Sequence, residues 1–183
     1  MTPFGRLVAR VAVLDRANVD TDQIIPARFL RKPRGPGYGG FLFHDEPALR
    51  DAVLGAGILV AGANFGCGSS REGAVYALVD AGVRCVIAPS FGDIFAANAG
   101  KNGLLLLEPP GGLVLRDGEE ATIDLLDQRI EAGGGCAMFE IDGFRKRMLV
   151  EGLDDIGLTL ALGPEMEAWA RQDAAVRPWV VVS

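Results

Sequence analysis

Short apolar runs alternate with segments of helical spacing in the middle of the chain. Three runs are long enough for buried strands, at residues 58–60, 84–88 and 103–107. Between them, residues 73–81 and 90–99 carry apolar side chains at helical spacing, and Ser90 suits the N-cap of the second helix. The region therefore predicts a sheet that is at least partly parallel, with helical crossovers.

The flanking regions follow other patterns. A valine-rich alternation over residues 6–14 predicts a first strand, and the aspartate-rich segment 15–26 predicts a loop that closes on a short helical turn. After the prolines and glycines at 109–112, three short segments predict antiparallel strands, at residues 121–125, 128–132 and 137–141.

The end of the chain is predicted to be helical. Residues 144–150 and 164–175 have helical spacing, and in the second segment Met166 and Trp169 share one face, which favours core packing over a binding site. Because the chain shows no internal repeat and no clear linker, we expect residues 1–183 to form a single domain with a C-terminal helical extension.

Composition narrows the class of protein. A chain of 183 residues can bury a sizeable core, and its net charge of −6 argues against a general nucleic-acid surface. The three cysteines are widely spaced without a CxxC pair, so neither a disulfide framework nor a zinc site is indicated. We find no signal sequence and no apolar run near the roughly 18 residues of a membrane span. These features predict a soluble, cytoplasmic protein.

Residues 31–40 (RKPRGPGYGG) form the most irregular segment. They combine four glycines, two prolines and three cations in ten positions. This composition predicts a mobile surface loop, and loops of this length often carry function, although a hairpin tip without a role is the simpler alternative.

The strongest candidate site is segment 64–72 (NFGCGSSRE), between a predicted strand and the helix that follows it. Such a junction exposes free backbone N–H groups and the positive end of the helix dipole, which together favour an anion. Arg71 adds a planar set of donors that matches a carboxylate or a phosphate. The alternative is a tight turn whose serines cap the helix. The density of small residues before the arginine favours a ligand site.

Common anion-binding and hydrolase motifs do not describe this segment. It lacks the ending of a P-loop, and Arg71 stands where a dinucleotide fingerprint needs its third glycine. His44, the single histidine, has no sequence link to a serine or to Cys67, and we expect it to be packed or on the surface. Ser69 is a candidate for an unusual base, because free N–H groups, a helix N-terminus and Arg71 would all stabilise its alkoxide.

At these residues the chain resembles a known family. Segment 64–72 is similar to the active-site motif of the swivel domain of the aconitase superfamily, and most of all to that of 3-isopropylmalate dehydratase small subunits. Three further segments agree in the family's order: NVDTDQIIP at 18–26, VIAPSFGDIF with a later KNG at 86–103, and GLDDIGLTL at 152–160. Four collinear motifs make the resemblance specific.

The resemblance implies an α/β fold, the aconitase-like swivelling β/β/α domain with a mixed sheet. It also implies a hydro-lyase that interconverts 2-isopropylmalate and 3-isopropylmalate through isopropylmaleate in leucine biosynthesis. In that family a separate large subunit holds a [4Fe–4S] cluster on three cysteines, and its open iron acts as a Lewis acid. This chain would hold no cofactor of its own, and Cys67 would not be a cluster ligand.

The resemblance assigns roles residue by residue. Ser69 takes the position of the base, while Ser70 and Arg71 contact a carboxylate of the small dicarboxylate substrate. Thr21 and Asp22 fall on the family's Thr-Asp pair, in which the aspartate helps to orient active-site cations.

A second group of residues lies where the family distinguishes substrate side chains, in the loop at 30–40. Arg28, Arg31 and Arg34 are candidates for the second carboxylate, and we rank Arg31 first. The prolines of the loop and Tyr38 would shape an apolar pocket.

Three positions depart from the family pattern. The family usually carries Arg-Glu-His-Ala-Pro where residues 71–75 are REGAV, and glutamate is common in place of Ala63. Gly73 weakens a helix by about 1 kcal/mol relative to alanine and removes a polar partner near the base. The alternatives are therefore a related hydro-lyase of the 2,3-dimethylmalate, citramalate or homoaconitate type, and a catalytically silent anion-binding or regulatory module.

Overall fold

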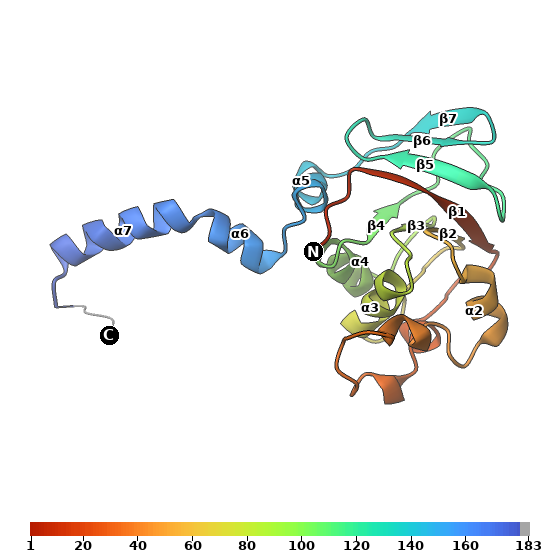
Figure 1. Cartoon of the computed structure of the whole chain (residues 1–183), viewed down its shortest axis with the longest axis horizontal. Coiled ribbons are helices and arrows are strands. Elements are labelled where there is room, and N and C mark those ends of the chain that lie inside the picture. Colours follow the sequence, from red (N-terminus) through yellow and green to blue (C-terminus); the bar gives the residue numbers. More distant parts are fainter. Residues whose placement is uncertain (180–183) are drawn as a thin grey trace.

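The computed structural model describes residues 1–179. Its elements follow in this order: β1 (Arg6–Leu14), α1 (Thr21–Ile24), the 3-10 helices η1 (Ala27–Phe29) and η2 (Tyr38–Phe41), α2 (Pro47–Val53), β2 (Ile58–Ala61), α3 (Glu72–Asp80), β3 (Cys85–Ile87), α4 (Asp93–Lys101), β4 (Leu105–Leu107), β5 (Glu120–Asp124), β6 (Arg129–Ala132), β7 (Gly135–Met138), α5 (Gly143–Glu151), α6 (Asp155–Ala161) and α7 (Gly163–Val176). Figure 1 shows a body built on one sheet and a helical arm that leaves it beside the N-terminus.

The body is organised by a seven-stranded sheet in the order β4-β3-β2-β1-β5-β6-β7. Strands β1 to β4 pair in parallel, whereas β5, β6 and β7 pair antiparallel on the other side of β1. The predicted change from parallel to antiparallel pairing is confirmed, and the mixed sheet with helices agrees with the expected α/β class.

β1 joins the two halves because its two ends pair with different strands. Residues 11–14 pair with 58–61 of β2, and residues 6–10 pair with 120–124 of β5. The two halves of the sheet are therefore offset along β1.

The parallel strands are buried on both faces, as their continuous apolar runs require. On one face, side chains such as Leu59 and Val86 pack with those of α3 and α4. On the other, Ile58 and Ile87 pack with β5, β6 and α5. The helices α3 and α4 therefore stand on a rigid base, with their N-terminal ends at the same edge of the sheet.

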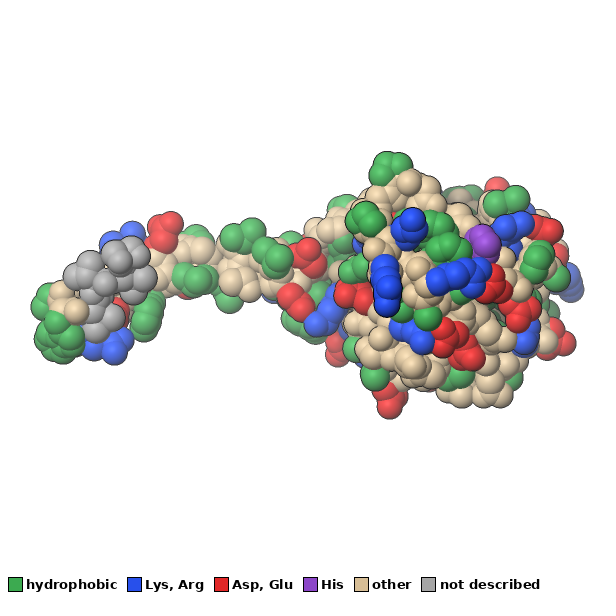
Figure 2. All heavy atoms as spheres, turned by 90° about the horizontal axis from the view of Figure 1, so that it is seen from below, with side chains coloured by type: hydrophobic (Ala, Val, Ile, Leu, Met, Phe, Trp, Pro, Cys, Tyr) green, Lys and Arg blue, Asp and Glu red, His purple; other side chains and the backbone are tan. Residues whose placement is uncertain are grey.

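The helical arm is not packed as its pattern predicts. No residue of α6 or α7 is buried, and Met166 and Trp169 are 53% and 62% exposed. Figure 2 shows hydrophobic side chains along both helices. Core packing of these two side chains is a wrong prediction, because helical spacing identifies an apolar face but not what covers it. The last part of the predicted extension, residues 180–183, lies outside the described residues.

Other boundaries differ by a few residues. The predicted helix at 90–99 begins at Asp93 with Gly92 as its N-cap, so Ser90 is not the cap. The third antiparallel strand lies at Gly135–Met138, earlier than its prediction. Asp154 caps α6 by accepting a hydrogen bond from the Gly157 amide over 2.7 Å, as expected of a turn residue. Of the helices in residues 1–179, none is both long and apolar enough to cross a membrane.

Removal of α7 should leave the body intact. A chain that ends at Ala161 loses no side chain that is buried within the described residues, so its melting temperature should change by less than about 2 °C. Calorimetry of both chains measures this change. A chain that ends at Asp142 is the control, because it also loses α5 with the buried Met148 and Leu149 and should melt far lower. Equal losses from both truncations would contradict the assignment of α7 as an independent arm.

Candidate functional site

The turn between β2 and α3 lies against the segment that leads into α1. The Thr21 amide donates a hydrogen bond to the Cys67 carbonyl over 2.9 Å, and the Gly66 amide donates to the Val19 carbonyl over 2.8 Å. The buried Thr21 hydroxyl donates to the Ser69 carbonyl over 2.9 Å. Thr21 therefore holds the turn at two of its carbonyls.

On its other side the turn lies against the segment that leads into α4. The Phe65 amide donates to the Ser90 carbonyl, the Asn64 amide donates to the Ser90 hydroxyl over 2.8 Å, and the Gly92 amide donates to the Phe65 carbonyl over 2.9 Å. A Cβ at Gly92 would lie 2.5 Å from the Gly66 carbonyl oxygen, so this approach requires glycine. Three of the four motifs that carry the resemblance meet at this turn.

The backbone of the turn needs left-handed conformations. Asn64, Gly66 and Gly68 have φ of 60°, 74° and 90°, which glycine adopts without strain and asparagine tolerates. A Cβ at Gly66 would also lie 2.2 Å from the ring of Phe95. The glycines of this motif are thus explained by geometry.

The turn leaves a row of unused donors. Within residues 1–179, the amides from Gly68 to Gly73 donate no hydrogen bond to protein atoms. The N-cap of α3 is Arg71, whose side chain makes no capping bond, and Ser69 and Ser70 are exposed. The alternative in which the serines cap the helix is therefore wrong. Free amides at a helix N-terminus form an anion site.

Arg71 is held beside these amides by Asp22. The two side chains form an ion pair, in which Arg71 is 14% exposed and Asp22 is 54% exposed. Asp22 lies in the first turn of α1, which a capping box between Asp20 and Gln23 fixes. The fold thus brings Thr21 and Asp22 to the turn that contains the serines.

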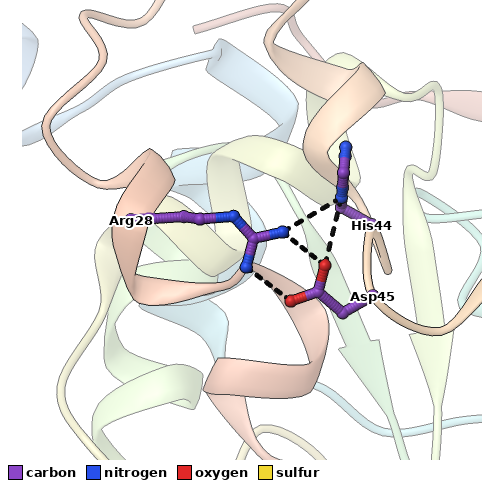
Figure 3. A network of polar contacts seen from close by, with 3 residues as sticks. All are labelled: Arg28, His44 and Asp45. Carbon is purple, nitrogen blue, oxygen red and sulfur yellow. Dashed lines mark hydrogen bonds and ion pairs between the residues drawn. The ribbon is translucent and has the colours of Figure 1, made fainter.

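The Arg28 side chain forms an ion pair with Asp45. Figure 3 shows its guanidinium directed at Asp45 and His44. It donates to Asp45 over 2.6 Å, lies 4.6 Å from the centroid of the Phe29 ring, and holds the pKa of the Asp45 carboxyl well below its usual range through these hydrogen bonds. His44 is exposed, as expected, and its ring contacts the Asp45 carboxylate.

The basic loop, defined as residues 30–40, carries the other two arginines. Arg34 pairs with Asp80 at the end of α3, whereas Arg31 is exposed and forms no ion pair within the described part of the chain. The tip of the loop is exposed, but the loop is attached to α3 through Arg34. The composition of the loop alone does not indicate this attachment. Figure 2 shows cations gathered on the face of the body that it occupies.

Gly73 lies under the basic loop. It is buried, and a Cβ there would lie 2.7 Å from Leu30 Cδ2 and 2.9 Å from the Tyr38 hydroxyl oxygen. Leu30 and Tyr38 thus fill the space into which a side chain at position 73 would extend. Packing in this chain therefore accounts for a glycine at this position.

The cysteines do not form a common site. Cys67 is half-buried in the turn, Cys85 is buried on β3, and Cys136 is exposed on β7. Burial raises the pKa of the Cys85 thiol. Among residues 1–179 no three His, Cys, Asp or Glu side chains are arranged to hold a metal ion.

The fold and the site define the class of protein. Residues 47–111, which include the turn, α3 and α4, match the model of the aconitase C-terminal domain. A crystal structure of 3-isopropylmalate dehydratase from Methanocaldococcus jannaschii superposes with a TM-score of 0.71 at 30% identity, over 91% of this chain and 99% of that one. The chain is thus a domain of the aconitase superfamily with a mixed α/β sheet.

Full-length relatives define the family more narrowly. The chain is 48% identical to the 3-isopropylmalate dehydratase small subunit of Acidobacterium capsulatum, over 94% of this chain and 91% of that protein. It is 44% identical to that of Jannaschia, over 98% and 100%, and 43% identical to that of Rhodospirillum rubrum, over 100% and 99%. The chain belongs to the family of 3-isopropylmalate dehydratase small subunits, which are subunits of a hydro-lyase.

Restoring the family's histidine should harm this chain. Gly73→His places a large side chain where Leu30 and Tyr38 lie, and overpacking of this kind costs about 1–3 kcal/mol. Urea unfolding measures the loss. Adding Leu30→Ala should recover part of it, because that change removes the atom nearest to the new side chain. A histidine variant as stable as the parent would contradict the packing described here.

Proposed function

We propose that this chain is the small subunit of a 3-isopropylmalate dehydratase and interconverts 2-isopropylmalate and 3-isopropylmalate through isopropylmaleate. The observation that carries this proposal is the row of free amides from Gly68 to Gly73, beside Arg71 and two exposed serines. Anion binding at this position fits a dicarboxylate substrate, and the family supplies the class of reaction.

One carboxylate of the substrate binds at the N-terminus of α3. The amides there donate without rearrangement, and the helix dipole favours the negative charge. The Arg71 guanidinium has five N–H donors. The ion pair with Asp22 engages the guanidinium through Nη1. Asp22 therefore orients the guanidinium while other donors stay available to the carboxylate, as does the Ser70 hydroxyl.

Ser69 is the proposed base. The hydrogen bond from the Thr21 hydroxyl to the Ser69 carbonyl fixes the backbone of Ser69, and with it the position from which the side chain extends. Free amides of the turn and Arg71 would favour the alkoxide over the hydroxyl. In dehydration the alkoxide would remove the proton from the carbon beside a carboxylate, the C–H electron pair would form the double bond, and the hydroxyl on the adjacent carbon would leave as hydroxide, a departure that a Lewis acid on the partner would assist. In rehydration, water would supply hydroxide to one carbon and the Ser69 hydroxyl would return the proton to the other.

The second carboxylate is assigned to Arg31. Of the three arginines near the basic loop, Arg28 and Arg34 are engaged by Asp45 and Asp80, which leaves Arg31 available. Leu30 beside it is 38% exposed and offers an apolar surface to an isopropyl group.

A large subunit completes this site in our proposal. Ser69 and Ser70 are exposed, so a second chain is needed to exclude water from the reaction. We assign a [4Fe–4S] cluster to that partner, as the family resemblance implies, where it would supply a Lewis acid. The unpaired cysteines suit the reducing cytoplasm in which we place the complex.

Ser69→Ala should abolish turnover without preventing assembly. Loss of a general base lowers kcat by about 10²–10⁴-fold. The assay uses the chain reconstituted with its large subunit, follows isopropylmaleate from 2-isopropylmalate, and checks assembly by size-exclusion chromatography.

Thr2→Ala is the matched control, since it removes an exposed hydroxyl outside the site and should leave turnover unchanged. Full activity of Ser69→Ala would overturn the assignment of the base. Turnover of citramalate or 2,3-dimethylmalate in preference to 2-isopropylmalate would point to the related hydro-lyases. A complex that binds diacids and converts none would be the silent module.

A further inference from the structure

The basic loop is attached to the C-terminal end of α3 by a specific ion pair. Arg34 donates through Nε and Nη2 to the two carboxylate oxygens of Asp80, over 3.0 Å and 2.7 Å. Its guanidinium also lies over the Tyr76 ring, 4.3 Å from the centroid. The two charged side chains are only 38% and 24% exposed. A bidentate pair stacked on an aromatic ring fixes both distance and direction.

Backbone contact reinforces this end of the attachment. A Cβ at Gly39 would lie 2.4 Å from the Ala81 nitrogen and 2.5 Å from the Asp80 carbonyl oxygen. The loop therefore lies directly on the end of the helix, and this close approach leaves room only for glycine at position 39.

The loop meets the N-terminal end of the same helix through apolar contacts. Leu30 and Tyr38 cover Gly73, one turn or less from Arg71. Tyr38 is 4% exposed, and its ring meets those of Phe41 and Tyr76 edge-on at 5.5 Å and 6.2 Å. The loop therefore spans α3 from one end to the other.

We infer that Arg34 and Asp80 are positioning residues that set where Arg31 stands relative to the carboxylate site at the start of α3. This inference rests on the proposed function. α3 carries the free amides at its N-terminus and the ion pair at its C-terminus, so one rigid element fixes both halves of the dicarboxylate site. A loop with four glycines would otherwise sample many conformations, and ordering it would weaken substrate binding.

The inference predicts a defect in binding rather than in chemistry. In the reconstituted enzyme, Arg34→Met and Asp80→Asn should each raise the KM for 2-isopropylmalate about tenfold and lower kcat less than about threefold. The double variant should be no worse than either single variant, because both remove the same contact. Exchange of the Tyr38, Gly40 and Leu42 amides, which are hydrogen-bonded within the loop, should become faster in each variant.

Lys32→Met is the matched control. It removes a cation from the same loop that makes no ion pair within the described residues, and it should change neither KM nor amide exchange. An equal rise of KM in this control would mean that general positive charge, not the ion pair, aids binding, and would overturn the inference.

The two proposals fail in different ways. Unchanged KM in Arg34→Met and Asp80→Asn, with an active parent enzyme that Ser69→Ala inactivates, would overturn the positioning role and leave the proposed function intact. A loss of kcat at unchanged KM would overturn it as well. A parent complex that converts no diacid would overturn the proposed function and the inference that rests on it.

Discussion

The site depends on the close approach of three backbone segments at the turn before α3. Gly66 has no room for a side chain beside Phe95, and Gly92 has none beside Gly66. These contacts engage the hydrogen-bonding groups at the start of the turn, whereas the amides from Gly68 to Gly73 have no partner among residues 1–179. The proposed anion site is thus a result of how tightly the turn is enclosed. A bulkier residue at either glycine would separate the segments that carry Thr21 and Asp22 from the serines.

In the proposed function, α3 links recognition at both ends of a small diacid. Its N-terminus presents the free amides and Arg71, and its last residue holds Arg34. The helix is fixed in turn by apolar packing on the parallel half of the sheet. β1 joins that half to the antiparallel half, because it pairs with both β2 and β5. The order of the strands therefore determines the geometry of the site through a single helix.

Local patterns predicted what local forces decide. The apolar runs identified the parallel strands, and the glycines identified a turn that needs positive φ, because strand burial and positive φ leave a mark in adjacent residues. Contacts between distant residues left no such mark. Ser90 resembles a helix cap, yet its hydroxyl binds the Asn64 amide, 26 positions away. The partners of Arg28 and Arg34 were likewise out of reach of sequence reasoning.

The role of Gly73 also depends on contacts with distant residues. In the sequence, Gly73 is recognisable only as a weak helix former and as a departure from the family pattern. In the fold it is the position where Leu30 and Tyr38 lie against α3. A residue that departs from the family pattern is thus explained by packing.

The central claim is that a substrate carboxylate binds the amides at the start of α3. A crystal structure of the reconstituted complex with 2-isopropylmalate tests it most directly. We expect one carboxylate within hydrogen-bonding distance of amides between Gly68 and Gly73 and of Arg71, with Ser69 beside the carbon that loses its proton. A substrate bound with both carboxylates away from this turn would contradict it.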